Sequence, residues 1–422
     1  MSKGYDHEYR REFYRNVDQR QALDARQSFY VELEEDAVRG SDLCAKLLST
    51  IEFSTGDAVT LVSGPRGSGK SSELIRLGQE LDKVDRPFYY TDIDDFLQPS
   101  AELTTSTFMV AVVVGLLEAT GEELPEQSKK DIAGKFKKFN INLEEINPSL
   151  KFGPGTLSAR LGIDLGSKGT AVRKEIDALI AGNPGQFYTA LREIVRQIVD
   201  GVTTGGEPPV FAIDSIDHWT GDHDTYDQIR TAVEHVFCTD GERLPLPGLH
   251  MIYTVPTYVS PGWTIPEAML NVMVVQEDGG TPFAPGVDAL TQVLTRRAPE
   301  GDLESLFADP AGIATVVRDS GGLFRILFQL IQQIILLAPD GHPATEATIK
   351  KAEATVRQSL ANGFTKEHFD ILRAVRDRPE GYEPEDKGWY YFNFLEARGA
   401  ILRYPDGDQP WHCVHPLLWP IL

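Results

Sequence analysis

The stretch that decides the fold is Gly64-Pro65-Arg66-Gly67-Ser68-Gly69-Lys70-Ser71, which matches the pattern G-x-x-x-x-G-K-[ST] at every required position. The segment before it, 58–63, is a short apolar run that predicts a buried strand, and 72–81 predicts a helix. A strand, a glycine-rich loop and a helix in this order are the context in which the pattern binds phosphate groups. The glycines let backbone N–H groups point inward, and the helix N-terminus adds positive charge.

The loop residues have expected parts in binding a nucleoside triphosphate. Lys70 is expected to reach the β- and γ-phosphates, and the Ser71 hydroxyl to ligate Mg²⁺. The residues assigned to phosphate binding are Gly64, Pro65, Arg66, Gly67, Ser68, Gly69, Lys70, Ser71 and Ser72. ATP and Mg²⁺ are therefore the expected cofactors. The alternative is a chance match in a glycine-rich turn, which would leave both flanking elements as coincidences.

A second segment supplies carboxylates. Val210-Phe211-Ala212-Ile213-Asp214 is an apolar run that ends in an acid, a Walker B pattern, so Asp214 is expected to hold Mg²⁺ together with Ser71. The next residue is Ser215 rather than glutamate, and the next acid is Asp217. We expect Asp217 to polarise the attacking water. The alternative is that Asp217 caps a helix that starts near His218.

The apolar segments predict an α/β fold with a parallel central sheet, because helical patterns lie between several of the predicted strands. The expected strands are 58–63, 87–93, 209–213, 250–255 and 271–275. The longest apolar run, 108–117, is about half of the ~20 residues that a membrane span needs, so it predicts a buried helix. Residues 121–208 are too long for one crossover and predict a hairpin at 149–163 and a helix ending near Val199.

Beyond residue 285 the pattern changes from strands to helices. Helices are expected at 290–294, 323–337, 345–360, 368–375 and 390–395, and one also at 38–51 ahead of the first strand. A hairpin is expected at 401–404 and 411–414, around the turn Pro405-Asp406-Gly407-Asp408. Helices followed by a terminal hairpin predict a winged-helix domain. Residues 1–30 predict a loosely docked polar helix.

On these residues the chain resembles the ASCE-division P-loop ATPases of bacterial type, the division that includes AAA+, STAND and KAP ATPases. The spacing of Asp214 and Asp217 is similar to the extended Walker B of STAND and KAP proteins. The segment Ser320-Gly321-Gly322-Leu323-Phe324-Arg325 resembles the start of the lid helix in origin-recognition initiators and STAND ATPases. Residues 402–417 are similar to the wing and last helix of their winged-helix domain. The resemblance covers roughly 30–120 and 205–422.

The resemblance implies a sheet of order 5-1-4-3-2 beneath a helical lid. It implies an N-terminal segment 1–30, an ATPase core 31–285 with insertion 121–205, a lid 286–362 and a winged helix 363–422. Thr254 matches the polar sensor position on the strand beside the Walker strands, and its alternative is an ordinary strand-end threonine. Arg325 matches the second sensor, and its alternative is a surface arginine. Arg296-Arg297 is a weaker candidate for that role and is expected to be a solvated helix face.

One departure from the family pattern concerns the arginine finger that AAA+ rings place before the fifth strand. Residues 257–275 contain no arginine or lysine. A finger is therefore absent or comes from elsewhere, such as Arg243. This departure favours a switch-like ATPase over a processive ring.

Charge and composition limit the kinds of partner that the chain can bind. The chain has 422 residues and a formal net charge of −22, which excludes a uniformly basic nucleic-acid coat. Segment 129–174 is locally basic and could grip nucleic acid or an acidic protein; the alternative is a solvated lysine-rich surface. The predicted recognition helix 388–398 is aromatic and nearly neutral, which suits a protein interface better than base contacts. The polar N-terminus and three distant cysteines indicate a cytoplasmic protein without a membrane span.

Three functions follow as hypotheses. The first is an ATP-driven molecular switch that hydrolyses ATP and assembles as a homo-oligomer with an unidentified partner protein, as in bacterial stress or anti-phage defence. The alternative is a nucleic-acid-binding AAA+ ATPase of the initiator or transposition-regulator kind. The third, a structural nucleotide-binding module without turnover, stays open because no glutamate follows Asp214.

Overall fold

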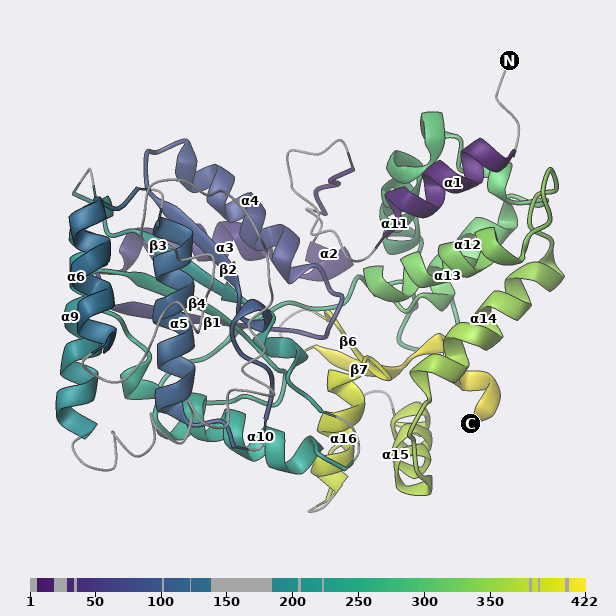
Figure 1. Cartoon of the computed structure of the whole chain (residues 1–422). Helices are drawn as coiled ribbons and strands as arrows, with labels where there is room; N and C mark the ends of the chain where they lie inside the picture. Colours follow the sequence, from purple (N-terminus) through teal and green to yellow (C-terminus); the bar gives the residue numbers. More distant parts are fainter. Residues whose placement is uncertain are drawn as a thin grey trace. The chain divides into compact units, whose positions relative to one another are not determined.

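The computed structural model describes residues 6–18, 29–33, 36–100, 102–121, 123–137, 184–203, 206–221, 224–378, 382–385, 388–406 and 410–422 (Figure 1). The chain divides into two compact units. The sheet unit comprises Leu47–Ser63 and Leu77–Glu267. The lid unit comprises Met1–Lys46, Gly64–Arg76 and Ala268–Leu422. The division into four segments that was expected from the sequence differs from these two units and stays a prediction.

The sheet has the P-loop NTPase topology that was expected. Its strand order is β2-β3-β4-β1-β5, which is 5-1-4-3-2 from the other edge. The long strands are β1 (Ala58–Ser63), β2 (Phe88–Asp92), β3 (Val210–Asp214) and β4 (His250–Val255), and neighbouring ones pair in parallel. All residues of β3 and β4 are buried, because a parallel sheet is covered on both faces.

The fifth strand differs from the prediction. It is the short β5 (Glu267–Ala268), whereas 271–275 was the expected position. The apolar run at 271–275 is extended, but its backbone bonds elsewhere: Asn271 N–H donates to the Arg403 carbonyl at 3.0 Å, and Met273 N–H to the Val38 carbonyl at 2.7 Å. A buried apolar run needs backbone partners, and these need not come from the central sheet.

Helices of the sheet unit cover the strands. The apolar run 108–117 lies in α5 (Thr105–Thr120), which is buried along almost its whole length, as predicted. A Cβ atom on Gly115 would lie 3.1 Å from the Thr91 side chain, so α5 packs closely on β2. Beside it lie α6 (Glu126–Lys137) and α9 (Pro184–Val202) (Figure 1). The hairpin predicted at 149–163 lies outside the described residues.

The helix predicted at 38–51 is broken. The structure has α2 (Asp36–Arg39) and α3 (Leu43–Phe53), separated at Gly40, whose φ is +79°. A left-handed glycine ends a helix at little cost, which explains the break. Directly after the phosphate-binding loop begins α4 (Lys70–Asp82), and α10 (Tyr226–Glu234) follows β3.

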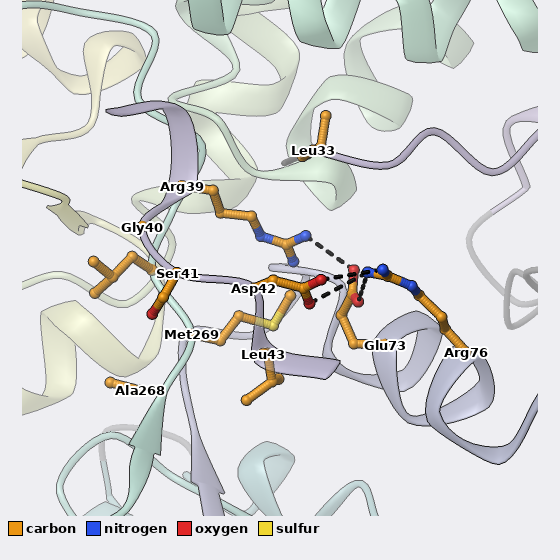
Figure 2. A pocket seen from close by; sticks show the side chains of 11 residues that line it. Leu33, Arg39, Gly40, Ser41, Asp42, Leu43, Glu73, Arg76, Ala268 and Met269 are labelled. Atoms are coloured by element: carbon orange, nitrogen blue, oxygen red, sulfur yellow. Dashed lines mark hydrogen bonds and ion pairs between the residues drawn. The ribbon is translucent and has the colours of Figure 1, made fainter. Parts of the chain in front are cut away.

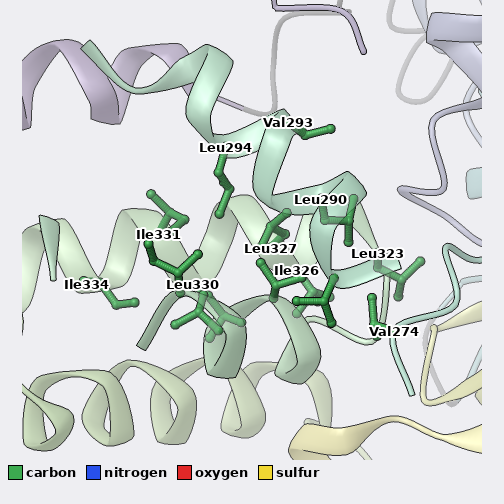
Figure 3. Close-up of a cluster of buried hydrophobic side chains, with 14 of the residues drawn as sticks. Val274, Leu290, Val293, Leu294, Leu323, Ile326, Leu327, Leu330, Ile331 and Ile334 are labelled. Carbon is green, nitrogen blue, oxygen red and sulfur yellow. The ribbon is translucent and has the colours of Figure 1, made fainter. Parts of the chain in front are cut away.

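The lid unit has its own hydrophobic core (Figure 3). Four helices build it: α11 (Ala284–Arg297), α12 (Ala311–Asp319), α13 (Phe324–Leu337) and α14 (Glu346–Leu360). The N-terminal helix α1 (His7–Asn16) was expected to dock loosely, and this is wrong. Tyr9, Phe13 and Val17 are buried in the same core, because α1 is amphipathic and presents these residues on one face.

The winged-helix pattern is present at the C-terminus. Helices α15 (Lys366–Asp377) and α16 (Gly388–Ala397) precede the antiparallel hairpin of β6 (Ile401–Tyr404) and β7 (Trp411–Val414). The hairpin strands lie at the predicted residues. Over the described ranges, none of the helices combines the length and the apolar character that a membrane crossing requires.

Two carboxyl groups meet in the lid unit where α12 ends. Asp319 and Glu353 are 8% and 9% exposed and share a hydrogen bond. Burial, and then the Asp319 carboxylate, raises the pKa of Glu353 to about 7. Below this pH a protonated Glu353 can donate to Asp319. Above it two negative charges lie together, so the folded state is penalised at alkaline pH.

Glu353→Gln keeps a hydrogen-bond donor and removes the charge. The free energy of unfolding should therefore exceed that of the wild type at about pH 8. The gain should shrink as the pH falls through 7 toward 4.5, the ordinary pKa of this carboxyl. Urea unfolding, monitored by circular dichroism at each pH, measures the free energy of unfolding of the variant and of the wild type. Glu346→Gln, on the exposed face of the same helix, is the control. An equal gain at both ends of the pH range would contradict the shared-proton interpretation.

Candidate functional site

The phosphate-binding loop lies in the lid unit and follows β1 directly. Gly67 and Gly69 have φ values of +86° and +101°, a region that side chains rarely adopt. A Cβ atom on Gly67 would lie 2.4 Å from Arg325 Cβ, and one on Gly69 would lie 3.3 Å from the Phe324 ring. The loop therefore needs glycine both for its curvature and for its contact with the start of α13.

Lys70 and Ser68 lie inside this loop. The Lys70 side chain is 3% exposed, and its ammonium donates to the carbonyls of Gly64 at 2.9 Å and Pro65 at 3.0 Å. The Ser68 hydroxyl is buried and has no hydrogen-bond partner within the part of the chain that the structure describes. Ser71 and Ser72 follow in the first turn of α4. A buried ammonium and an unsatisfied hydroxyl in a glycine cradle fit the oxygens of a bound phosphate.

A network that the sequence did not reveal fixes this loop (Figure 2). Arg39 donates to the Ser68 carbonyl at 2.6 Å and to the Glu73 carboxylate at 3.2 Å. Glu73 also accepts from Arg76 at 3.4 Å, and Arg76 pairs with Asp42 at 3.1 Å. Burial lowers the pKa of Arg39, and the Glu73 carboxylate opposes that shift. The only signal in the sequence was the spacing of Glu73 and Arg76 on one helix face.

Arg325, which the sequence suggested as the second sensor, lies beside the loop. Its backbone N is 3.4 Å from the position that a Gly67 Cβ would occupy. Burial, followed by the charges of Arg66 and Arg398, lowers the pKa of Arg325 to about 10. The alternative of a simple surface arginine does not describe this half-buried, positively surrounded position. Its role toward a nucleotide stays a prediction.

The sheet unit holds Asp214, the predicted Walker B residue, at the carboxyl end of β3. Asp214 is 1% exposed; it accepts from the Tyr90 hydroxyl at 2.7 Å and from the Ser215 N–H at 2.8 Å. Ser215 adopts a left-handed conformation with φ of 72°. Such strain in a residue other than glycine costs free energy and is frequent at functional sites. It turns the chain sharply after Asp214.

This turn brings Asp217 and Thr254 together. Asp217 lies inside the 3₁₀ turn Ile216–His218, whose N-cap residue is Ser215. Asp217 is therefore not the N-cap of a helix that starts near His218, which was the alternative to its catalytic role. The Thr254 hydroxyl donates to Asp217 Oδ1 at 3.5 Å, and His218 Nε2 lies 3.8 Å from Oδ2. Asp217 is 5% exposed and Thr254 is fully buried. Asp217, which was assigned to the attacking water, and Thr254, which was assigned to the polar sensor position, are thus neighbours.

Asp92 is a further carboxylate that sequence reasoning missed. It ends β2 directly opposite Asp214 in the parallel register. Burial is the main cause that raises the pKa of Asp92 to about 6, against hydrogen bonds from the Ser215 side chain and the Asp94 N–H. The signal was available, because Asp92 ends an apolar strand just as Asp214 does.

The structure also bears on the expectations for the arginines at 296–297 and for Arg243. Arg297 is 4% exposed and donates to the Phe29 carbonyl at 3.0 Å, so the expectation of a solvated face at 296–297 is wrong for this residue. It lies over the Phe328 ring, which explains its burial. Arg243 stacks on the Tyr188 ring at 4.7 Å and pairs with Asp240 at 3.3 Å. Its use as a finger stays a prediction.

Comparison with known proteins gives only distant structural likenesses. No protein-family model and no curated protein matches this sequence. The structure is similar to that of a Walker-type ATPase of Pyrococcus abyssi, with 16% identity, a TM-score of 0.44, and 96% of this chain and 98% of that chain covered. The Aeropyrum pernix ORC2 protein, in ADPNP–ADP complexes, has 12% identity, a TM-score of 0.41 and coverage of 96% and 93%.

The ORC1 protein of the same organism, in complex with DNA, has 10% identity, a TM-score of 0.38 and 92% coverage of each chain. Likenesses at this level concern the fold and transfer no ligand or partner. The bacterial type and the closeness to STAND and KAP proteins stay predictions.

Proposed function

We propose that this protein binds ATP with Mg²⁺ and hydrolyses it, and that it works as a nucleotide-dependent switch. The observation that carries the proposal is the glycine loop with Lys70 folded inside it and a buried Ser68 hydroxyl. The lid helix α13 starts against that loop. A terminal phosphate in the loop would therefore act directly on the lid.

Binding of the nucleotide and its hydrolysis would use different residues. The loop and Lys70 would hold and neutralise the phosphates. Ser71 and Asp214 would hold Mg²⁺, which supplies charge neutralisation between the phosphates when it is bound. Asp217 would orient water as a base, with Thr254 beside it.

The partner class is the less constrained part of the proposal. A role in stress or anti-phage defence has no support in the comparisons, whose printed names agree better with the nucleic-acid alternative. The charges of this chain favour a protein partner. Helix α6 carries four lysines against two acids, whereas in α9 two arginines are balanced by two acids. Helix α16 exposes Trp389 and contains no cation. Most of segment 129–174 lies outside the described residues.

Lys70→Ala removes the ammonium from the loop. We expect ATP affinity to fall by roughly tenfold or more, because charge-assisted hydrogen bonds to phosphate are lost, and hydrolysis to vanish. Fluorescence titration and phosphate release measure these quantities. Lys83→Ala, an exposed residue just after the same helix, is the control. Unchanged turnover in Lys70→Ala would refute the loop assignment.

Asp217→Asn separates binding from turnover. If Asp217 orients water, ATP·Mg²⁺ should bind as in the wild type, while kcat should fall ~10²–10⁴-fold, the range typical of a lost general base. Asp214→Asn should instead raise the Mg²⁺ concentration needed for activity. Asp227→Asn, exposed on α10, is the matched control. Wild-type kcat in Asp217→Asn would leave this carboxylate with a structural role only.

DNA binding distinguishes the two partner classes. We expect the wild type to bind duplex DNA only weakly, above micromolar concentrations, and Lys129, Lys130 and Lys135 replaced together by Ala to change this little. A nucleic-acid ATPase would instead show a tight, salt-dependent complex, and the slope of log K against log salt would shrink by ~0.9 for each contact removed. Anisotropy titrations over a salt series decide between these outcomes.

A further inference from the structure

His218 lies between two carboxylates of the sheet unit. Its Nδ1 atom is 3.8 Å from Asp94 Oδ2, and its Nε2 atom is 3.8 Å from Asp217 Oδ2. Asp94 belongs to the 3₁₀ turn Ile93–Asp95, which follows β2, whereas His218 and Asp217 belong to the turn that follows β3. Because β2 and β3 pair in parallel, the turns that follow them lie at the same edge of the sheet.

The second oxygen of each carboxylate has a partner of its own. Asp94 Oδ1 accepts from Trp219 Nε1 at 3.0 Å, and Asp217 Oδ1 accepts from the Thr254 hydroxyl at 3.5 Å. Each carboxylate therefore keeps its Oδ2 atom turned toward the imidazole. The polar groups form one continuous chain, which runs through Thr254, Asp217, His218 and Asp94.

The backbone around His218 is also held. The His218 N–H donates to the Ser215 carbonyl at 3.0 Å, and the Trp219 carbonyl accepts from the Tyr258 hydroxyl at 2.8 Å. The Trp219 ring is fully buried and packs edge-on against Phe108. A short turn that is anchored in this way keeps the imidazole between the two carboxylates.

Exposure to solvent rises along this chain of polar groups. Thr254 is fully buried, and the Asp217 side chain is 3% exposed. The side chains of His218 and Asp94 are 30% and 37% exposed. The buried carboxylate that is assigned to the attacking water is therefore connected to solvent by an imidazole, a group that can accept a proton on one nitrogen and release one from the other.

We propose that His218 takes the proton from Asp217 after each hydrolysis and passes it to solvent, while Asp94 orients the imidazole. This inference rests on the proposed function, since it concerns the base that was assigned there. It gives His218 and Asp94 roles as positioning and proton-transfer residues that act through Asp217. Neither residue was assigned a role in hydrolysis from the sequence.

The proton has a defined route in this proposal. As the water oxygen bonds to the terminal phosphorus, ADP leaves with the electron pair of the broken P–O bond, and the proton of that water moves to Asp217. Asp217 must lose this proton before the next turnover. Nε2 of the neutral His218 imidazole accepts it, and Nδ1 releases a proton to solvent beside Asp94. Exchange of the imidazole protons with water then restores the starting tautomer.

A competing account is that a cationic His218 only holds Asp217 in place by ionic attraction. A contact of 3.8 Å is longer than a hydrogen bond and allows this account, although catalytic contacts often shorten when the substrate binds. The two accounts require opposite charge states of the ring. A proton acceptor must be neutral imidazole, whereas an ionic partner must be imidazolium. Free imidazole added to a variant without the His218 ring therefore separates the accounts.

The experiment measures kcat and KM for ATP in the full chain by phosphate release. His218→Ala should lower kcat by roughly tenfold, less than loss of the base itself, because solvent still removes the proton slowly, and should change KM by less than about twofold. Free imidazole can enter the space that this half-exposed side chain leaves, and it should restore part of kcat. Relative to the wild type at the same pH, the restored part should be larger at about pH 8 than at about pH 6, because more of the imidazole is neutral there.

Two further variants accompany this one. Asp94→Asn keeps an acceptor for Trp219 Nε1 but removes the carboxylate that orients the ring, so kcat should fall by a few fold and free imidazole should not restore it. His235→Ala is the matched control, because His235 has the same 3.8 Å contact with a carboxylate, that of Asp240, on another part of the sheet unit. It should hydrolyse ATP like the wild type, with and without imidazole.

A wild-type kcat in His218→Ala, a loss that imidazole does not restore, or a rescue that is larger at the lower pH would overturn the inference. If His218→Ala does not give the wild-type circular dichroism spectrum, Asp94→Asn decides, and a wild-type kcat in that variant overturns the inference. Failure of the proposed function is distinguishable, because then the wild type would not hydrolyse ATP or Asp217→Asn would keep its kcat. A lowered kcat in Asp217→Asn beside a wild-type kcat in His218→Ala refutes the role of His218 alone.

Discussion

The close approach between the phosphate-binding loop and the start of α13 is the constraint on which the lid unit depends. The loop can lie there only because Gly67 and Gly69 have no side chains and have positive φ values. Any other residue at these positions would push α13 away, and α13 is the central helix of the lid core. The residues that make the loop able to wrap phosphate therefore also make it able to touch the lid.

The sheet unit meets a different constraint at the carboxyl ends of its strands. Parallel strands place their last residues along one edge, so Asp92 and Asp214 face each other in register. Burying a carboxylate is costly, and burial is the main cause of the raised pKa of Asp92, to which the charges of Asp94 and Asp214 add. A cation near Asp214 would reduce it. The strained turn at Ser215 adds Asp217 to the same edge.

The sequence predicted what depends on local pattern and missed what depends on tertiary packing. The loop, β1 to β4, the buried α5 and the terminal hairpin all follow from periodicity and glycine spacing. The fifth strand was misplaced because 271–275 has strand-like apolarity but finds its backbone partners in Arg403 and Val38. Arg39 and Arg297 were beyond prediction for the same reason: a lone arginine in the sequence does not reveal that a carboxylate or an aromatic ring will cover it.

Charge distribution links these observations. The chain is strongly acidic overall, yet arginines gather at the phosphate-binding loop, and there the structure pairs Arg39 and Arg76 with Glu73 and Asp42. Arg325 instead experiences the positive charges of Arg66 and Arg398. Phosphate oxygens would supply negative charge at that place, so nucleotide binding should stabilise the lid unit as well as occupy it. A ligand present at a hundred times its Kd adds about 2.7 kcal/mol to the folded state. This is comparable with the few kcal/mol by which two packings of one sequence differ in proteins that switch between them.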